Sequence, residues 1–217
     1  VTNLEKADRE YGPLEMLKTL RFWLMIVLMC LASMTGIMFV GALSGIAQAQ
    51  LGVGTAAASW IVGISALANF VGRMGFGRVC DRLGEAKTVL IILIVTILSL
   101  FIMRNAFTIP LFITCLIFIG AAFGGVLVCF PPFTQKVFGM ENSGVNYGIM
   151  FLGYASGSYF GPQIAAKTKM LGPDGAVMAT SYANAYSIAI GVGVAGIVVC
   201  LLLMYVKGRY ANQVKAA

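Results

Sequence analysis

A glycine-rich, charged stretch ends one of the long apolar runs of this chain: NFVGRMGFGRVCDRLGEAK, residues 69–87. Its second part, residues 77–87, is a GxxxDRxGxxK cluster, whereas Arg73 stands inside the apolar run itself. A cation is unfavourable wherever its surroundings are hydrocarbon, so the position of Arg73 needs a physical reason. The rest of the sequence shows what those surroundings are.

The composition is that of a membrane protein. Hydrophobic residues make up 59% of the chain, charged residues only 11%, and the mean hydropathy is +0.91. Soluble domains are about 45–50% apolar and about 25% charged, so this chain has too few charges for a water-exposed surface. The sequence therefore predicts that the lipid bilayer is its immediate partner.

Six apolar runs fit membrane spans, which take roughly 20 helical residues for ~30 Å of hydrocarbon. They cover residues 22–46, 56–79, 88–103, 110–134, 145–167 and 182–206, and the third is the shortest. The runs lack the ~10-residue alternation of barrel strands, and helices satisfy their own backbone hydrogen bonds in lipid. The predicted fold class is an all-α membrane protein with six transmembrane helices, residues 22–206.

Lysine and arginine fall mostly on one side of these spans. If the N-terminus is cytoplasmic, the other side holds only Arg104, Lys167 and Lys169, and the cytoplasmic side holds eleven: Lys6, Arg9, Lys18, Arg21, Arg78, Arg82, Lys87, Lys136, Lys207, Arg209 and Lys215. Cytoplasmic loops carry such an excess, so we expect both termini in the cytoplasm and the protein in the inner or plasma membrane. Residues 1–21 then form a cytoplasmic linker and 207–217 a cytoplasmic tail. Topology explains the net charge of +7, so we expect no nucleic-acid partner.

The residue types that most enzymes use are missing or dispersed. The sequence has no histidine, its five cysteines form no CxxC pair, and its eight acidic residues all lie in predicted loops or termini. This excludes a His-ligated haem and a Ser-His intramembrane protease, and it disfavours a zinc site or a disulfide framework. We expect no enzyme activity, no cofactor and no metal site.

Arg73 lies deep in the second predicted span. Eight residues separate it from Asp81, which is about 12 Å at 1.5 Å per helical residue. At roughly 100° per residue, Arg73 shares a polar stripe with Ser65 and Asn69. Such arginines usually face a bundle interior or a watery cavity, and their planar donor fork suits a carboxylate. We interpret Arg73, Asn69 and Ser65 as an anion-binding stripe; the alternative is a snorkelling or structurally paired arginine.

The GxxxDRxGxxK cluster follows on the predicted cytoplasmic side. Gly77 and Gly84 permit close backbone approach and a tight turn, and Asp81 can pair with an arginine or cap a helix. We interpret Gly77, Asp81, Arg82 and Gly84 as a loop, residues 77–87, that takes part in conformational change. The alternative is an ordinary basic loop, which the orientation alone would explain.

Four blocks of sequence carry a family resemblance: FWLMIVLMCLASMTGIMFVG (22–41), ANFVGRMGFGRVCDRLG (68–84), FGGVLVCFPPFTQKVFG (123–139) and NYGIMFLGYASGSYFG (146–161). The second block resembles the signature loop of the major facilitator superfamily. Together the blocks resemble the C-terminal half of its oxalate/formate antiporter family. The resemblance implies half of a twelve-helix bundle built from inverted three-helix repeats, with an N-terminal six-helix half as the missing partner.

The same resemblance implies roles for two positions. In that family an arginine in the eighth helix of the full protein helps to bind the dicarboxylate, and Arg73 looks like its counterpart. Oxalate-transporting members also carry a lysine in the eleventh helix, where this sequence has Tyr154. The loss of one of two cations favours a monocarboxylate, or another less charged anion, over oxalate.

Glycines recur every four residues in the fourth and fifth spans, at Gly120, Gly124, Gly153, Gly157 and Gly161. Such ridges let another helix approach closely, so we expect helix packing there. On another face of the fifth span, Tyr154 and Ser158 are candidate substrate contacts, with core packing as the alternative. Pro131 and Pro132 are expected to break or bend the fourth span.

Three functions compete on this basis. The first is a secondary active transporter of a small organic anion, a monocarboxylate or related carboxylate, that works by alternating access. The second is a pore or channel subunit assembled from six-helix protomers, although the sequence has no TVGYG-like filter. The third is a membrane-embedded enzyme, which the missing histidines and intramembrane acids disfavour. We carry the transporter forward as the prediction.

Overall fold

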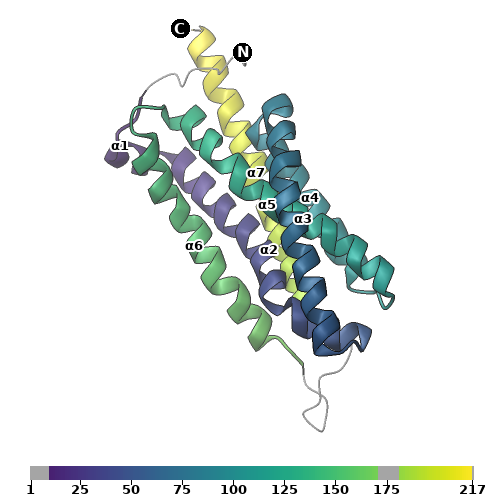
Figure 1. The fold of residues 1–217 in the computed structure, drawn as a ribbon. Helices are drawn as coiled ribbons and strands as arrows, with labels where there is room; N and C mark the ends of the chain where they lie inside the picture. The colour runs from purple at the N-terminus through teal and green to yellow at the C-terminus, as the bar shows by residue number, and fades with distance from the viewer. Residues whose placement is uncertain (1–9, 171–180, 217) are drawn as a thin grey trace.

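A computed structural model describes residues 10–170 and 181–216, with side chains described as far as Val206. Its helices are α1 (Pro13–Leu17), α2 (Leu20–Leu51), α3 (Thr55–Leu83), α4 (Glu85–Met103), α5 (Ile109–Phe138), α6 (Ser143–Lys167) and α7 (Ala183–Ala216). The long helices α2 to α7 form one elongated bundle in which consecutive helices run in opposite directions (Figure 1). The predicted all-α architecture is confirmed for the described residues.

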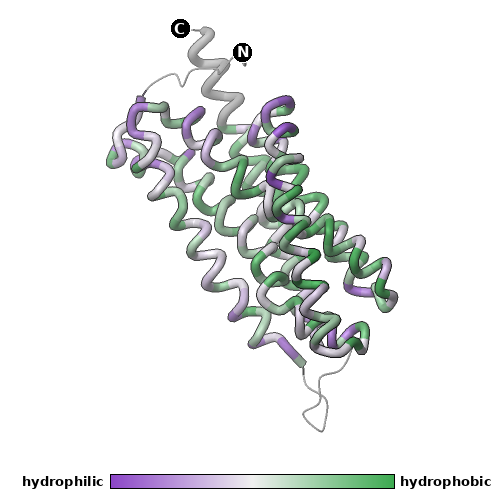
Figure 2. Tube along the Cα trace, in the orientation of Figure 1, coloured by the Kyte–Doolittle hydropathy of each residue, from purple (hydrophilic) through white to green (hydrophobic). Residues whose placement is uncertain are grey.

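Five of the described helices are long and apolar enough to cross a membrane: α2, α3, α4, α5 and α7 as far as Val206. The predicted fifth span, α6, has sufficient length with 25 residues, but glycine, serine and tyrosine dilute its apolar residues. Figure 2 shows this mixed hydropathy along α6. The bundle is therefore a multi-pass membrane protein, while the count of six spans depends on α6 and stays a prediction.

The connections between helices gather at the two ends of the bundle. One end, here called the basic end, holds α1, the α3–α4 turn and the α5–α6 connection (Figure 1). The opposite end holds the α2–α3 and α4–α5 connections, the end of α6 and the start of α7. This grouping agrees with the predicted topology, and a cytoplasmic basic end remains a prediction. Some of the basic residues lie outside the described part of the chain, namely Lys6, Arg9 and the side chains of Lys207, Arg209 and Lys215.

Glycines bring α6 into backbone contact with α2. A Cβ atom added to Gly153 would lie 2.5 Å from the carbonyl oxygen of Ile26, and one added to Gly157 would lie 2.5 Å from that of Cys30. Gly161 continues the same ridge one turn further on. Any side chain at these positions would force the two helices apart, so the predicted packing role of this ridge is confirmed.

A second ridge brings α5 onto α3. A Cβ atom added to Gly120 would lie 2.9 Å from the carbonyl oxygen of Ser65, and one added to Gly124 would collide with the carbonyl oxygen of Asn69. Gly72 of α3 lies against the α5 backbone in the same way. Residue numbers rise together along both interfaces, so α2 and α6 are parallel to each other, and so are α3 and α5.

The helix pairings repeat within the bundle. Helix α2 packs closely against α6 and α7, and α5 packs closely against α3 and α4. Exchanging α2 with α5, α3 with α6 and α4 with α7 converts the first set of pairings into the second. Because α2 and α5 run in opposite directions, the exchange relates two inverted three-helix units. The packing thus displays the inverted repeat that the family resemblance implies.

Part of the predicted linker folds onto the basic end. Met16 of α1 is fully buried in the core. The backbone N–H of Tyr11 donates to the carbonyl oxygen of Phe138 over 2.9 Å, and the Glu10 carboxylate accepts from the backbone N–H of Glu141 over 3.0 Å. Residues 10–17 of the predicted linker therefore pack onto the bundle, while residues 1–9 lie outside the described part.

The two prolines of α5 do not interrupt it. The helix continues through Pro131 and Pro132 to Phe138, so of the expected break or bend the break is wrong and the bend stays a prediction. Each proline removes a helical hydrogen bond donor, but the neighbouring Phe130 and Phe133 are buried in the core. Tertiary packing of these rings holds the last turns of α5 in helical form.

We expect Gly157→Ala to destabilise the bundle, because its new methyl group would press on the α2 backbone. Overpacking of this kind costs about 1–3 kcal/mol. The matched control is Gly148→Ala on the same helix, where an added Cβ meets nothing within 4 Å; it should be neutral or slightly stabilising. Thermal unfolding in detergent, followed with a dye that reacts with newly exposed thiols, measures both. Equal midpoints for the two variants would contradict backbone contact at Gly157.

Candidate functional site

Arg73 lies at mid-depth in the bundle and its side chain is exposed. Its backbone nitrogen would lie 3.2 Å from a Cβ atom added to Gly124, and Gly124 stands at the middle of α5. The middle of a spanning helix lies near the bilayer midplane. The structure therefore places Arg73 at the depth that the sequence predicts.

Asn69 orients the guanidinium group of Arg73. The Arg73 Nε–H donates to Asn69 Oδ1 over 3.2 Å, one helical turn away. This bond occupies Nε and leaves the two terminal Nη groups available to a ligand. Arg73 forms no ion pair with any described residue, so a structural acidic partner is not found in that part of the chain. Two of the predicted site residues are thus brought together.

Tyr154 lies at the same level on α6, within an aromatic cluster. Its ring stacks on Phe151 of the same helix, with centroids 4.7 Å apart, and on Phe123 of α5, with centroids 6.4 Å apart. Phe123 and Gly124 are consecutive residues, so one turn of α5 contacts both the Tyr154 ring and the backbone at Arg73. Arg73 and Tyr154 are therefore level with each other along the bundle, joined through α5.

Phe123 was not predicted as part of the site. It occupies space that Gly36 of α2 leaves open, since a Cβ atom on Gly36 would lie 2.5 Å from the Phe123 ring. The only hint in the sequence was that Phe123 directly precedes Gly124 and so lies on the helix face next to a packing ridge. That signal alone does not distinguish a site residue from a core residue.

The two predicted serines are placed differently from Arg73. Ser65 is buried, and its hydroxyl lies 3.4 Å from a Cβ atom added to Gly120, so it faces α5. Ser158 is half-buried, and its hydroxyl donates to the backbone carbonyl of Tyr154 over 2.8 Å. Neither hydroxyl joins the exposed guanidinium group. The polar stripe seen in the sequence therefore divides into an exposed part at Arg73 and a buried part at Ser65.

The predicted loop at residues 77–87 is mostly helix, which corrects its extent. Helix α3 takes in three of the four predicted loop residues: Gly77, Asp81 and Arg82. The connection to α4 is Gly84 alone, with φ 83° and ψ 160°. Only glycine commonly adopts this conformation, so a single residue reverses the chain where the sequence predicted a longer loop. A role for these residues in conformational change stays a prediction.

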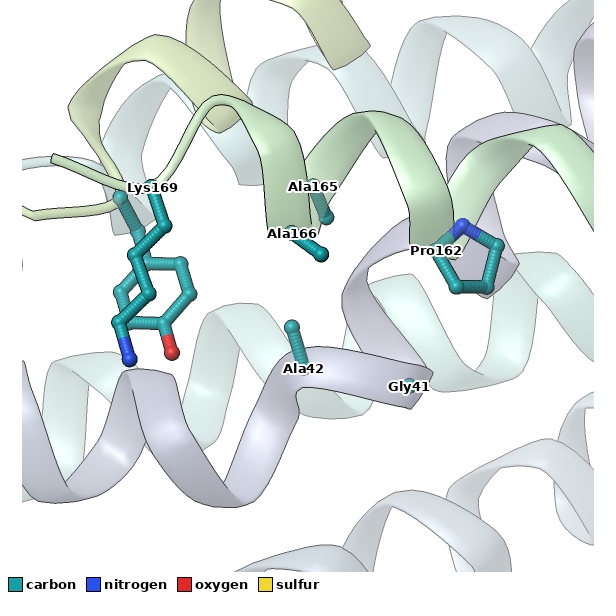
Figure 3. Close-up of a pocket in the computed structure, with 7 residues that line it drawn as sticks. Gly41, Ala42, Pro162, Ala165, Ala166 and Lys169 are labelled. Atoms are coloured by element: carbon teal, nitrogen blue, oxygen red, sulfur yellow. The ribbon is translucent and has the colours of Figure 1, made fainter.

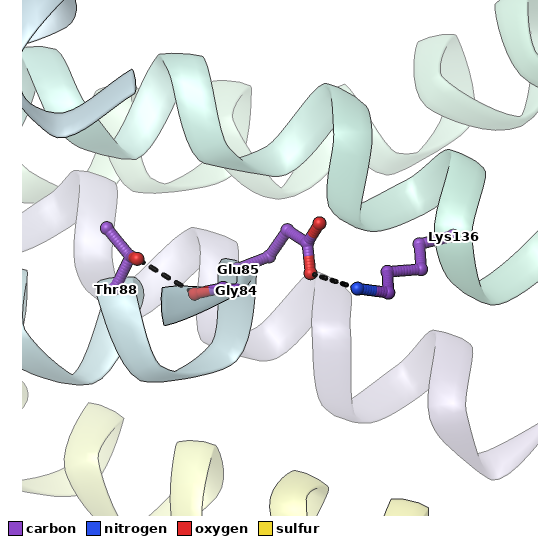
Figure 4. A network of polar contacts seen from close by, with 4 residues as sticks. All are labelled: Gly84, Glu85, Thr88 and Lys136. Carbon is purple, nitrogen blue, oxygen red and sulfur yellow. Dashed lines mark hydrogen bonds and ion pairs between the residues drawn. The ribbon is translucent and has the colours of Figure 1, made fainter. Parts of the chain in front are cut away.

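Polar contacts tie this turn to α5 (Figure 4). The carbonyl oxygen of Gly84 accepts a hydrogen bond from the Thr88 hydroxyl over 2.8 Å. The Glu85 carboxylate, in the first turn of α4, forms an ion pair with Lys136 of α5 over 3.5 Å. A carboxylate at a helix N-terminus also interacts favourably with the helix dipole. The ion pair thereby holds the start of α4 against the end of α5.

A comparison with known protein families agrees with this all-helical membrane architecture. Residues 23–216 match the Major Facilitator Superfamily. The chain belongs to the major facilitator superfamily. It is therefore a multi-pass membrane protein of a transporter family, and transporters of this kind move their substrates without covalent chemistry.

Two relatives cover most of the chain. An uncharacterized MFS-type transporter, YhjX, of Escherichia coli (strain K12) is 28% identical over 156 residues, which is 70% of this chain and 38% of the relative. The oxalate:formate antiporter of Oxalobacter formigenes is 28% identical over 168 residues, 74% of this chain and again 38% of the relative. The chain thus spans less than half the length of the curated relatives it matches.

We expect Gly84→Ala to destabilise the protein by about 1–3 kcal/mol, because a Cβ atom strains this backbone conformation. Gly75→Ala is the matched control: Gly75 is a helical residue of α3, and an added Cβ meets nothing within 4 Å there. Melting curves recorded by far-UV circular dichroism should show a lower Tm for the first variant only. A Tm at Gly84→Ala equal to that of the parent would refute the one-residue turn.

Proposed function

We propose that this chain is the C-terminal half of a secondary active transporter for a small organic anion, a monocarboxylate or related carboxylate. The observation that carries the proposal is Arg73: a mid-depth, exposed arginine, oriented by Asn69 and without an ion-pair partner among the described residues. The family supports transport, and the relative named an oxalate:formate antiporter supports carboxylates.

In the proposed mechanism, Arg73 binds the carboxylate of the substrate through its two Nη groups. Charge-assisted, bidentate pairs of this kind are both strong and directional. Asn69 keeps the guanidinium plane fixed, and the aromatic cluster of Tyr154 and Phe123 supplies the surface for the remainder of the anion. Ser65 and Ser158 have packing roles in this mechanism, because one is buried against α5 and the other is bonded to its own helix.

Alternating access requires a second wall for the site. We propose an N-terminal six-helix half as that wall, docking over the exposed faces of α3 and α6. Large apolar side chains on α3, such as Trp60, Leu67 and Phe70, are exposed in the chain by itself. The 38% coverage of both relatives agrees with a half-length chain. In this proposal the protein lies in the inner or plasma membrane with its basic end in the cytoplasm. The turn at Gly84 changes conformation as the two halves move relative to each other.

Arg73→Gln is expected to lower kcat/KM for formate exchange by roughly 10- to 150-fold. A hydrogen bond to a charged group contributes about 1.5–3 kcal/mol, and each 1.36 kcal/mol is a factor of ten. The measurement is uptake of labelled formate into formate-loaded vesicles that contain the full-length gene product. Arg104→Gln, at an exposed arginine outside both the proposed site and residues 77–87, is the control and should behave like the parent. Unchanged exchange by Arg73→Gln would remove this residue from the site.

Tyr154→Lys is expected to raise the preference for oxalate over formate at least about tenfold, because it adds a second cation at the level of Arg73. Tyr154→Phe keeps the ring without a charge and should leave the preference as it is. Competition of each anion with labelled formate in the same vesicles gives the ratio. A preference that stays constant in Tyr154→Lys would show that position 154 does not face the anion.

A further inference from the structure

A cavity lies at the opposite end of the bundle, away from Arg73. Its volume is about 290 Å³, and it is formed between α2 and α6 with the start of α7 (Figure 3). Small side chains line its walls, among them Gly41 and Ala42 of α2 and Ala166 of α6. Two polar side chains complete the lining, Lys169 and Tyr182.

The chain brings these two polar side chains together across a long stretch of sequence. The backbone N–H of Met170 donates to the carbonyl oxygen of Ser181 over 2.8 Å, which places the neighbouring residues Lys169 and Tyr182 side by side. The Lys169 ammonium lies 5.5 Å from the centroid of the Tyr182 ring. This cation–π contact holds the ammonium at the cavity wall.

Neither polar group is satisfied within the part of the chain that is described. Lys169 forms no ion pair there, and the Tyr182 hydroxyl, which lies against Gly45 of α2, has no hydrogen bond there. A cation and a hydrogen-bond donor therefore converge on one cavity with apolar walls.

We propose that this cavity is a second site for a small organic monoanion, separate from Arg73. The Lys169 ammonium and the Tyr182 hydroxyl bind the carboxylate, and the walls formed by Gly41, Ala42 and Ala166 contact a short hydrocarbon chain. A volume at the lower limit of ligand pockets, roughly 300 Å³, suits an anion of a few carbon atoms. The ligand class rests on the proposed function, but the site itself rests on the cavity.

The two sites lie at different depths. Lys169 is 15 residues beyond Tyr154, and the helical rise puts it about 20 Å further along the bundle. The second site therefore lies near the end of the bundle opposite the basic end.

Protection of Lys169 from acylation tests the proposal without relying on transport. The full-length protein is treated with an acetate N-hydroxysuccinimide ester, with and without butyrate, and acylation of each lysine is quantified by mass spectrometry. With butyrate at about four times its Kd, one fifth of the sites stay free, so acylation of Lys169 should fall about fivefold. Lys167, exposed and two residues away, is the internal control and should not change. Sodium chloride replaces butyrate at equal ionic strength in the reference sample.

Each outcome decides the proposal. Protection of Lys169 alone, retained in Arg73→Gln, supports a separate site. No protection, equal protection of Lys167, or loss of protection in Arg73→Gln would overturn it. Failure of the proposed function has a different signature, which is unchanged formate exchange by Arg73→Gln.

A cavity-filling variant tests the walls. Ala166→Leu adds volume beside Lys169 at an exposed position, where folding tolerates it, and it should abolish protection while Lys169 stays reactive. Ala195→Leu, exposed on α7 and outside the cavity, should keep the protection of the parent. Full protection in Ala166→Leu would contradict the assignment of this cavity.

Discussion

Backbone contact between parallel helices is the constraint on which this structure depends. Lipid gives helices no hydrophobic reason to associate, so close van der Waals packing has to hold the bundle together. The glycines of α6 lie against carbonyl groups of α2, and those of α5 against carbonyl groups of α3. A side chain at Gly157 or Gly124 would separate the partners. These contacts fix how α3 and α6 are rotated about their own axes. They thereby decide which way the side chains of the proposed site residues point.

The inverted repeat gives this constraint a functional consequence. The helices that carry Arg73 and Tyr154, α3 and α6, exchange with each other under the repeat, and each is fixed by a ridge contact to one central helix, α5 or α2. One face of each is thereby held rigidly and another is left exposed. For the proposed transporter, this arrangement suits a rocking mechanism, in which the proposed site residues stay fixed within one half while the exposed faces change partner.

What the sequence predicts correctly depends on composition and period. The helices, the glycine ridges and the depth of Arg73 follow from apolar length and from residue spacing. The separation of Ser65 from Arg73 does not, because it is set by which face of α3 meets Gly120. Likewise, the backbone conformation of Gly84 makes residues 77–87 the end of α3 and the start of α4 where the sequence predicted a loop. The Gln50 amide donates to the carbonyl oxygen of Met103 over 2.7 Å, and these two residues are 53 positions apart in the sequence. A contact over such a separation leaves no local pattern in the sequence.

The single positive charge of Arg73 at mid-depth determines which anion charge the proposed transporter binds best. One arginine and one carboxylate form a neutral pair, so the occupied site adds no net charge to a low-dielectric region. A dianion at the same site would leave one negative charge uncompensated, since Tyr154 supplies no cation and Asn69 only a dipole. The empty site is also cationic, because no described acid neutralises Arg73. In the proposed transporter, binding a monoanion therefore neutralises the charge of Arg73 at mid-depth, and a neutral loaded site is the one best suited to be enclosed between two halves.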